Sequence, residues 1–136
     1  PTYHGNNMGN GLYGMDAPLS TGINLMITDP MFTAGESFVL DAVVTNGEQT
    51  QYDSADVYII LDVYGMYWFY PSWSEAADWM DIDPLAPGSS LINVFTFDWP
   101  AGIAGGAENL FFWAGMIDDQ FQLLGDIDYV SFGYSD

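Results

Sequence analysis

The sequence contains no lysine, no arginine and no cysteine among its 136 residues, whereas aspartate and glutamate together number 19. A chain without cationic side chains has nothing to neutralise phosphate, so we expect it to bind no nucleic acid and no anionic membrane surface. The lack of cysteine excludes disulfides and thiol chemistry. Because no lysine or arginine can pair with the carboxylates, we expect hydrogen bonds, solvent cations or bound metal to compensate them.

Long apolar runs are missing as well. A membrane-spanning helix needs about 18 or more consecutive apolar residues, and the sequence has no such run, so we expect no membrane insertion. The chain begins at Pro1 with no signal peptide. Together with the lack of basic residues, this start indicates a processed chain that is secreted to the cell surface.

Residues suited to catalysis are scarce. His4 is the only histidine, and without cysteine or lysine the sequence offers neither a convincing nucleophile–base pair nor a usual zinc site. Two carboxylates can hydrolyse a glycosidic bond, but 19 acidic residues make some pair inevitable, so that pattern is unspecific. We therefore expect no enzymatic activity.

The residues that are present indicate one folded, all-β domain. Hydrophobic residues make up 49% of the chain and aromatic residues 17%, which is far from the composition of a disordered acidic chain. Patterns typical of strands, separated by Gly, Pro, Asp and Asn, occupy residues 22–28, 37–46, 56–70, 90–99, 109–118 and 127–134. One helical turn is expected at 74–80, capped by Ser74. The pattern predicts an antiparallel β-sandwich, immunoglobulin-like or jelly-roll-like, over residues 22–136, preceded by an extended Gly/Asn-rich N-terminal arm, residues 1–21.

Three stretches carry a family resemblance. "FTAGESFVLDAVVTNG" (32–47), followed by "DVYIILDVYGMYWFYPSW" (56–73), resembles the immunoglobulin-like β-sandwich modules of secreted bacterial surface proteins, and "LGDIDYVSF" (124–132) resembles the closing strand of such modules. The resemblance covers about half of the chain. It implies an extracellular sandwich with a structural or adhesive role, and it carries over no catalytic residue.

Aspartates near the expected loops are candidate metal ligands. Fifteen of the 19 acids are aspartate, a short side chain that suits turns and calcium loops, and alternate aspartates on an extended loop can converge on one Ca²⁺. No EF-hand pattern is present. The candidates are Asp53, Asp56, Asp81, Asp83, Asp118, Asp119, Asp126 and Asp128. The alternative is that these are turn-forming aspartates that only solvate the surface.

Several expected strands are apolar on both faces. If 56–70 is one strand, its odd positions, such as Tyr67 and Phe69, face the core, and its even positions, such as Trp68 and Tyr70, face outward. Segments 91–99 and 109–117 show the same doubling. Strands of this kind are buried on both faces or covered by a partner. The candidates for a subunit interface or a sugar-stacking surface are Tyr58, Tyr64, Trp68, Tyr70, Trp73, Trp79, Phe111 and Trp113.

Three functions remain open. The first is a non-enzymatic subunit of an extracellular filament or layer, stabilised by Ca²⁺, in which copies of the chain join through apolar strand faces and a donated arm. The arm residues considered for this contact are Tyr3, Leu12, Tyr13, Ile23, Leu25 and Ile27. The alternative is a carbohydrate-binding module that stacks a polysaccharide on exposed Trp and Tyr rings. The third is a plain spacer domain whose arm folds back on its own sandwich.

Overall fold

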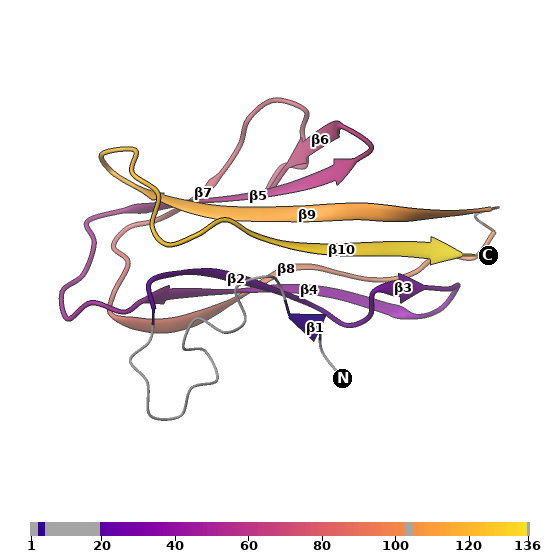
Figure 1. Ribbon diagram of the computed structural model, residues 1–136, viewed down its shortest axis with the longest axis horizontal. Coiled ribbons are helices and arrows are strands. Elements are labelled where there is room, and N and C mark those ends of the chain that lie inside the picture. The colour runs from indigo at the N-terminus through magenta and orange to yellow at the C-terminus, as the bar shows by residue number, and fades with distance from the viewer. Residues whose placement is uncertain (1–2, 5–19, 103–104, 136) are drawn as a thin grey trace.

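Two β-sheets packed face to face form the domain (Figure 1). The computed structural model describes residues 3–4, 20–102 and 105–135. Over these residues it contains no helix, and so none long and apolar enough to cross a membrane. The strands are β1 (Tyr3–His4), β2 (Gly22–Ile27), β3 (Met31–Phe32), β4 (Ser37–Asn46), β5 (Ala55–Val63), β6 (Met66–Phe69), β7 (Met80–Ile82), β8 (Gly88–Asp98), β9 (Gly106–Asp118) and β10 (Asp128–Ser135).

The strand order makes this an antiparallel β-sandwich, as the sequence predicts. One sheet has four strands in the order β1-β2-β4-β8. The other has six: β3-β10-β9-β5-β6, with β7 also paired to β5. Every pairing is antiparallel except that of β10 with the two-residue strand β3. In the described part of the chain, β8 therefore lies at one edge of the four-stranded sheet and β1 at the other.

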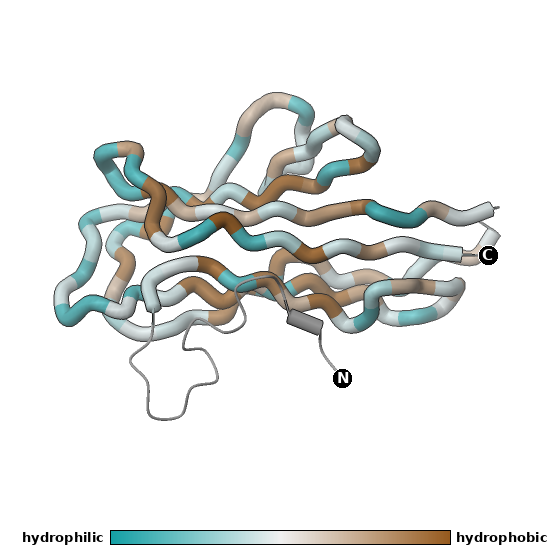
Figure 2. The backbone as a smooth tube through the Cα atoms, viewed as in Figure 1, coloured by the Kyte–Doolittle hydropathy of each residue, from teal (hydrophilic) through white to brown (hydrophobic). Residues whose placement is uncertain are grey.

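Alternating side chains build the core between the sheets. In β4 the apolar residues Phe38, Leu40, Ala42 and Val44 are buried, as the period-two pattern predicts. Figure 2 shows the hydrophobic positions along the strands and many of the hydrophilic ones in the loops. At one end the core is aromatic, because the ring of Phe38 lies 5.1 Å from that of Phe97 between centroids. Packing of this kind adds to the area-based stabilisation of burial.

The segment expected to be one long strand is a hairpin. Strand β5 ends at Val63, and Tyr64 and Gly65 both have positive φ, 51° and 86°, as a type I′ turn requires. Because the loop has two residues, odd and even positions pair with each other across the hairpin: odd Leu61 pairs with even Trp68, and even Asp62 pairs with odd Tyr67. The expected parity is therefore wrong beyond the turn. Tyr67 lies on the outer face, and Trp68 lies on the inner face.

A β-bulge explains why apolar residues occupy both odd and even positions in 91–99. Leu40 pairs with Phe95 and Asp41 with Asn93, which leaves Val94 as an extra residue in β8. The extra residue switches the alternation, so apolar side chains on both sides of the bulge reach the core. Leu91, on the outer face, is 62% exposed. A locally irregular strand thus replaces the expected strand with two covered faces.

The helical turn expected at 74–80 is absent. Ser74 forms an isolated bridge with Phe69, and Met80 begins β7. The Asp78 carboxylate accepts hydrogen bonds from the backbone N–H groups of Ser72 and Trp79, at 3.1 and 2.9 Å. These side-chain bonds offer the backbone an alternative to helical bonding, which is a known property of aspartate.

The start of the arm belongs to its own domain. Tyr3 pairs with Ile27 in the antiparallel β1–β2 contact. The candidate arm residues Ile23, Leu25 and Ile27 lie in β2, with side chains buried in the core. Two other candidates, Leu12 and Tyr13, lie outside the described residues.

A buried carboxylate ties the two sheets together. Asp128, in β10, is fully buried, and its Oδ2 accepts a hydrogen bond of 2.7 Å from the backbone N–H of Leu25 in β2. Leu25 is itself fully buried, so the bond satisfies a main-chain donor that water does not reach.

Candidate functional site

The candidate metal ligands do not converge on one point. Among the residues that the structure describes, no group of three or more His, Cys, Asp or Glu side chains lies close enough to hold a metal ion. Asp128 is buried, and Asp118 accepts hydrogen bonds of 2.9 Å from the N–H groups of Gln120 and Gln122, which makes it a turn-forming residue. The exposed candidates are Asp53, Asp81, Asp83, Asp119 and Asp126. Calcium binding stays a prediction.

Two of the candidates do meet. Asp56 in β5 lies directly opposite Asp81 in β7. The pKa of Asp56 is raised to about 6, first by a hydrogen bond with the Asp81 carboxyl group, then by partial burial and by the negative charge of Asp81. Because one proton relieves the repulsion between two adjacent carboxylates, the pair holds a proton in weakly acidic solution.

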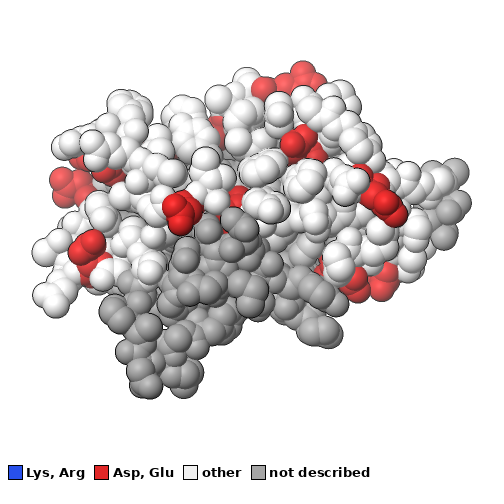
Figure 3. All heavy atoms as spheres, in the orientation of Figure 1, with Lys and Arg blue, Asp and Glu red and all other residues white. Residues whose placement is uncertain are grey.

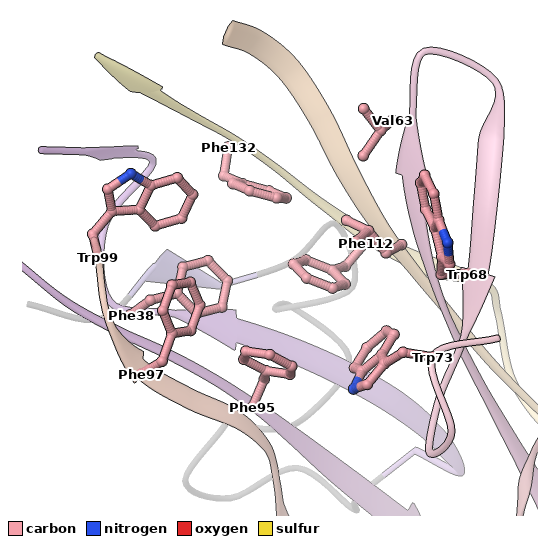
Figure 4. Close-up of a pocket in the computed structure, with 10 residues that line it drawn as sticks. Phe38, Val63, Trp68, Trp73, Phe95, Phe97, Trp99, Phe112 and Phe132 are labelled. Atoms are coloured by element: carbon pink, nitrogen blue, oxygen red, sulfur yellow. The ribbon is translucent and has the colours of Figure 1, made fainter. Parts of the chain in front are cut away.

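An apolar cleft opens between the sheets, beside β8. It has a volume of about 480 Å³. We call it the inter-sheet cleft. Its lining residues are Phe38, Leu61, Val63, Trp68, Trp73, Phe95, Phe97, Trp99, Phe112 and Phe132. Figure 4 shows Trp68 and Trp73 on one side, facing Phe95 and Phe97 on the other. Among the residues that the structure describes, no carboxylate, amide or hydroxyl side chain lines the cleft.

Three residues expected on a surface platform lie in or beside this cleft instead. Trp73, in a loop at φ 53°, places its ring 5.5 Å from that of Phe95. Trp68 lines the cleft because of the hairpin, and the Tyr70 ring packs edge-on against Trp73 at 5.6 Å. None of these rings lies flat on an open sheet face, so they do not form the expected sugar platform.

A second hollow lies on the opposite side of the six-stranded sheet. It has a volume of about 430 Å³, and we call it the outer groove. Its lining residues are Tyr58, Ile60, Asp62, Tyr67, Trp113, Ala114, Gly115, Ile117, Leu123 and Ile127. Gly115 forms its floor, because a side chain is missing at the position opposite Tyr58.

Rings and one carboxylate shape this groove. The indole N–H of Trp113 donates to Asp62 Oδ2 at 3.1 Å, and Asp62 Oδ1 accepts the N–H of Gly65 at 3.0 Å. The rings of Phe111 and Tyr129 lie 5.6 and 5.1 Å from Trp113. Two hydrogen bonds thus hold Asp62, and a hydrogen bond and two rings hold Trp113.

The remaining candidates border this face. Trp79 is 41% exposed and lies 5.6 Å from the Tyr58 ring, and Tyr64, at the hairpin tip, is 66% exposed and donates its hydroxyl to the Glu108 carbonyl at 2.7 Å. The sequence did not single out Tyr67, Gly115 or Tyr129. The dipeptide Tyr64–Gly65 would have revealed Tyr67, since a two-residue turn reverses parity. No local feature of the sequence indicates that Tyr129 lies beside Trp113.

The surroundings of the groove are negative. Figure 3 shows carboxylates scattered over one face of the molecule with no basic residue between them. The pKa of Tyr58 is raised, first by partial burial and then by the charges of Asp56 and Asp81. The Asp56 and Asp81 carboxylates thus lie close enough to Tyr58 to make that end of the groove negative.

Comparisons with known proteins show only a distant structural likeness to two solved structures. The CARDB domain of the PF1109 protein from Pyrococcus furiosus, solved in complex with di-metal ions, is 15% identical with a TM-score of 0.46, over 85% of this chain and 89% of that one. Spo0M, a sporulation control protein from Bacillus subtilis, is 12% identical with a TM-score of 0.33, over 87% of this chain and 51% of that one, so the chain spans about half its length. No family model and no curated protein matches the sequence. The chain's own two sheets establish that it is a β-sandwich.

Proposed function

We propose that the protein is a non-enzymatic subunit of an extracellular assembly, in which each copy accepts a strand of the next copy beside β8. One observation carries the proposal: an edge strand with no partner in the described part of the chain lies next to a cleft lined only by apolar side chains. Strand addition uses both features, since the edge supplies backbone hydrogen bonds and the cleft receives alternate side chains.

The edge of β8 lacks the usual protection against pairing. Proteins that stay monomeric commonly place charges along an exposed edge strand. Of the eleven residues of β8 only Asp98 is charged, and it is the last one. The chain has 19 carboxylates, so the scarcity of charge along β8 favours the hypothesis that another strand covers this edge in the assembled protein.

The lining of the cleft favours a strand over a small polar ligand. Sites for small molecules combine an apolar lining with a few placed polar groups that fix the orientation of the ligand. The inter-sheet cleft has no such side chain. Apolar side chains of an added strand need none, because the backbone of β8 fixes their position.

The N-terminal arm of a neighbouring copy is the proposed donor. Residues 1–21 carry a single carboxylate, Asp16, and include the apolar Leu12 and Tyr13. In the single chain the arm begins with β1, which pairs with β2 at the edge of the four-stranded sheet opposite β8, so donation requires this two-residue contact to open. A donor and an acceptor at opposite edges make a head-to-tail contact, and repetition of that contact produces an open filament.

Charge makes such an assembly dependent on ions. Each copy carries a formal net charge of −19, so neighbouring copies repel one another. Salt screens this repulsion, and Ca²⁺ can bridge carboxylates of adjacent subunits. We therefore expect assembly to increase with NaCl and to increase further with CaCl₂ at equal ionic strength.

The test is the assembly state of the purified chain, measured by light scattering and by negative-stain electron microscopy. Wild type should form filaments, and Thr96→Asp, which places a charge on β8, should not. Ser131→Asp, which adds the same charge to an exposed position of the internal strand β10, should assemble like wild type. A wild-type chain that stays monomeric at every salt and CaCl₂ concentration overturns the proposal.

Deletion of the arm tests the donor. A chain of residues 22–136 should not polymerise, and a synthetic peptide of residues 1–21 should bind to it, more weakly when Val63→Trp narrows the cleft. Unchanged filaments from the truncated chain would exclude the arm as donor.

A further inference from the structure

The outer groove has the form of an open aromatic cage. Tyr58 pairs with Gly115 and Ile60 with Trp113, so Tyr58 and Trp113 are diagonal neighbours on adjacent strands. Diagonal neighbours on one sheet face lie about 7–8 Å apart. Because Gly115 has no side chain, the hollow reaches the backbone between the two rings, where the side chains of Ile127 and Leu123 border it. Tyr67, 49% exposed, borders the same hollow.

The charges around the groove favour a cationic ligand. The faces of Tyr and Trp rings are negative, and they attract a cation placed over them. Asp62 adds a carboxylate to the wall, and the carboxylates of Asp56 and Asp81 lie near Tyr58 at one end. In a chain of formal charge −19, no lysine or arginine opposes this field. An anion is repelled here, and a neutral apolar group gains nothing from the carboxylates.

We propose that the outer groove binds a compact alkylammonium cation, with the alkylated nitrogen between Tyr58 and Trp113 and close to Asp62. Alkyl groups suit the apolar walls, which include Ile117 and Ile127, and they desolvate more easily than a metal ion does. The groove lies on the outer face of the six-stranded sheet, whereas β8 is an edge strand of the four-stranded sheet, so this site is separate from the proposed contact at β8.

Calorimetric titration of the full chain with choline tests the proposal at constant ionic strength, because a strongly acidic protein attracts all cations weakly. The uncharged isostere 3,3-dimethylbutan-1-ol is the matched ligand. Choline should bind at one site per chain, at least about tenfold more tightly than the isostere. Equal binding of both, or no binding of choline, overturns the proposal. Binding of a neutral oligosaccharide in place of choline also overturns it, in favour of a sugar site.

Two variants locate the site. Asp62→Asn keeps a similar shape and one acceptor oxygen, for either Trp113 or the Gly65 N–H, but removes the charge, and it should weaken choline binding about tenfold. Asp98→Asn, the same change on β8, should not. Gly115→Leu places a side chain on the floor and should abolish binding in a chain that stays folded; its Cβ alone would meet the side chains of Ile127 and Leu123 at an ordinary 3.7 Å. Unchanged affinity in a folded Gly115→Leu protein refutes the assignment.

Discussion

The carboxylate of Asp128 gives the sharpest test of how the two sheets are held together. Substitution by alanine removes the acceptor of the 2.7 Å hydrogen bond and leaves the buried N–H of Leu25 without it. Leaving a buried donor without its acceptor costs about 1–3 kcal/mol. We therefore expect Asp128→Ala to lower the free energy of unfolding by about 2 kcal/mol.

The size of this effect makes it measurable by heat or by urea. For a chain of this length, each kcal/mol shifts Tm by about 3–4 °C, so Asp128→Ala should melt about 6 °C lower. Urea titration followed by tryptophan fluorescence gives the free energy directly. Hydrogen exchange at the Leu25 amide should accelerate more than exchange at other amides of β2.

Two variants serve as controls. Asp128→Asn keeps an acceptor oxygen for the Leu25 N–H, so it should lose less stability than Asp128→Ala. Ser131→Ala, at an exposed position of the same strand, should change stability by less than about 0.5 kcal/mol. If Asp128→Ala is as stable as Ser131→Ala, the hydrogen bond to β2 does not stabilise the sandwich and the reasoning is wrong.

Three further predictions concern acid, backbone and calcium. The folded-state pKa of Asp56, about 6, lies above the usual 3.8, so the pair with Asp81 stabilises the fold below pH 3.8 and this contribution disappears as the pH rises through about 6. The Tm of Asp81→Asn relative to wild type should thus rise between about pH 4 and pH 7, and a constant difference would contradict the pairing. Gly125→Ala should cost more than about 3 kcal/mol in a urea titration, because its Cβ would collide with the Thr21 carbonyl oxygen, whereas Gly65→Ala, in open space at a similar positive φ, should cost about 1 kcal/mol. CaCl₂ should raise Tm more than NaCl does at equal ionic strength, and EDTA should reverse the increase; identical melting curves would remove calcium from the proposal.

The sequence by itself determined the class of fold and much of the strand plan. The alternation in 37–46 matches β4, and Phe38, Leu40 and Val44 face the core as that pattern requires. Such agreement is expected because the period of two is a property of the extended backbone and needs no knowledge of the partner strand. The absence of lysine, arginine and cysteine likewise needed no structure to limit the chemistry of the chain.

Tertiary structure decided which way the rings point. The turn at Tyr64–Gly65 and the bulge at Val94 each shift the alternation by one residue, and a one-residue shift moves every later side chain to the other face of its strand. The turn places Trp68 in the inter-sheet cleft and Tyr67 beside the outer groove, and the bulge turns Phe95 and Phe97 toward the core. The groove also requires β5 and β9 to align so that Tyr58, Gly115 and Trp113 become neighbours. That register depends on contacts between residues more than 50 positions apart, which local sequence does not encode.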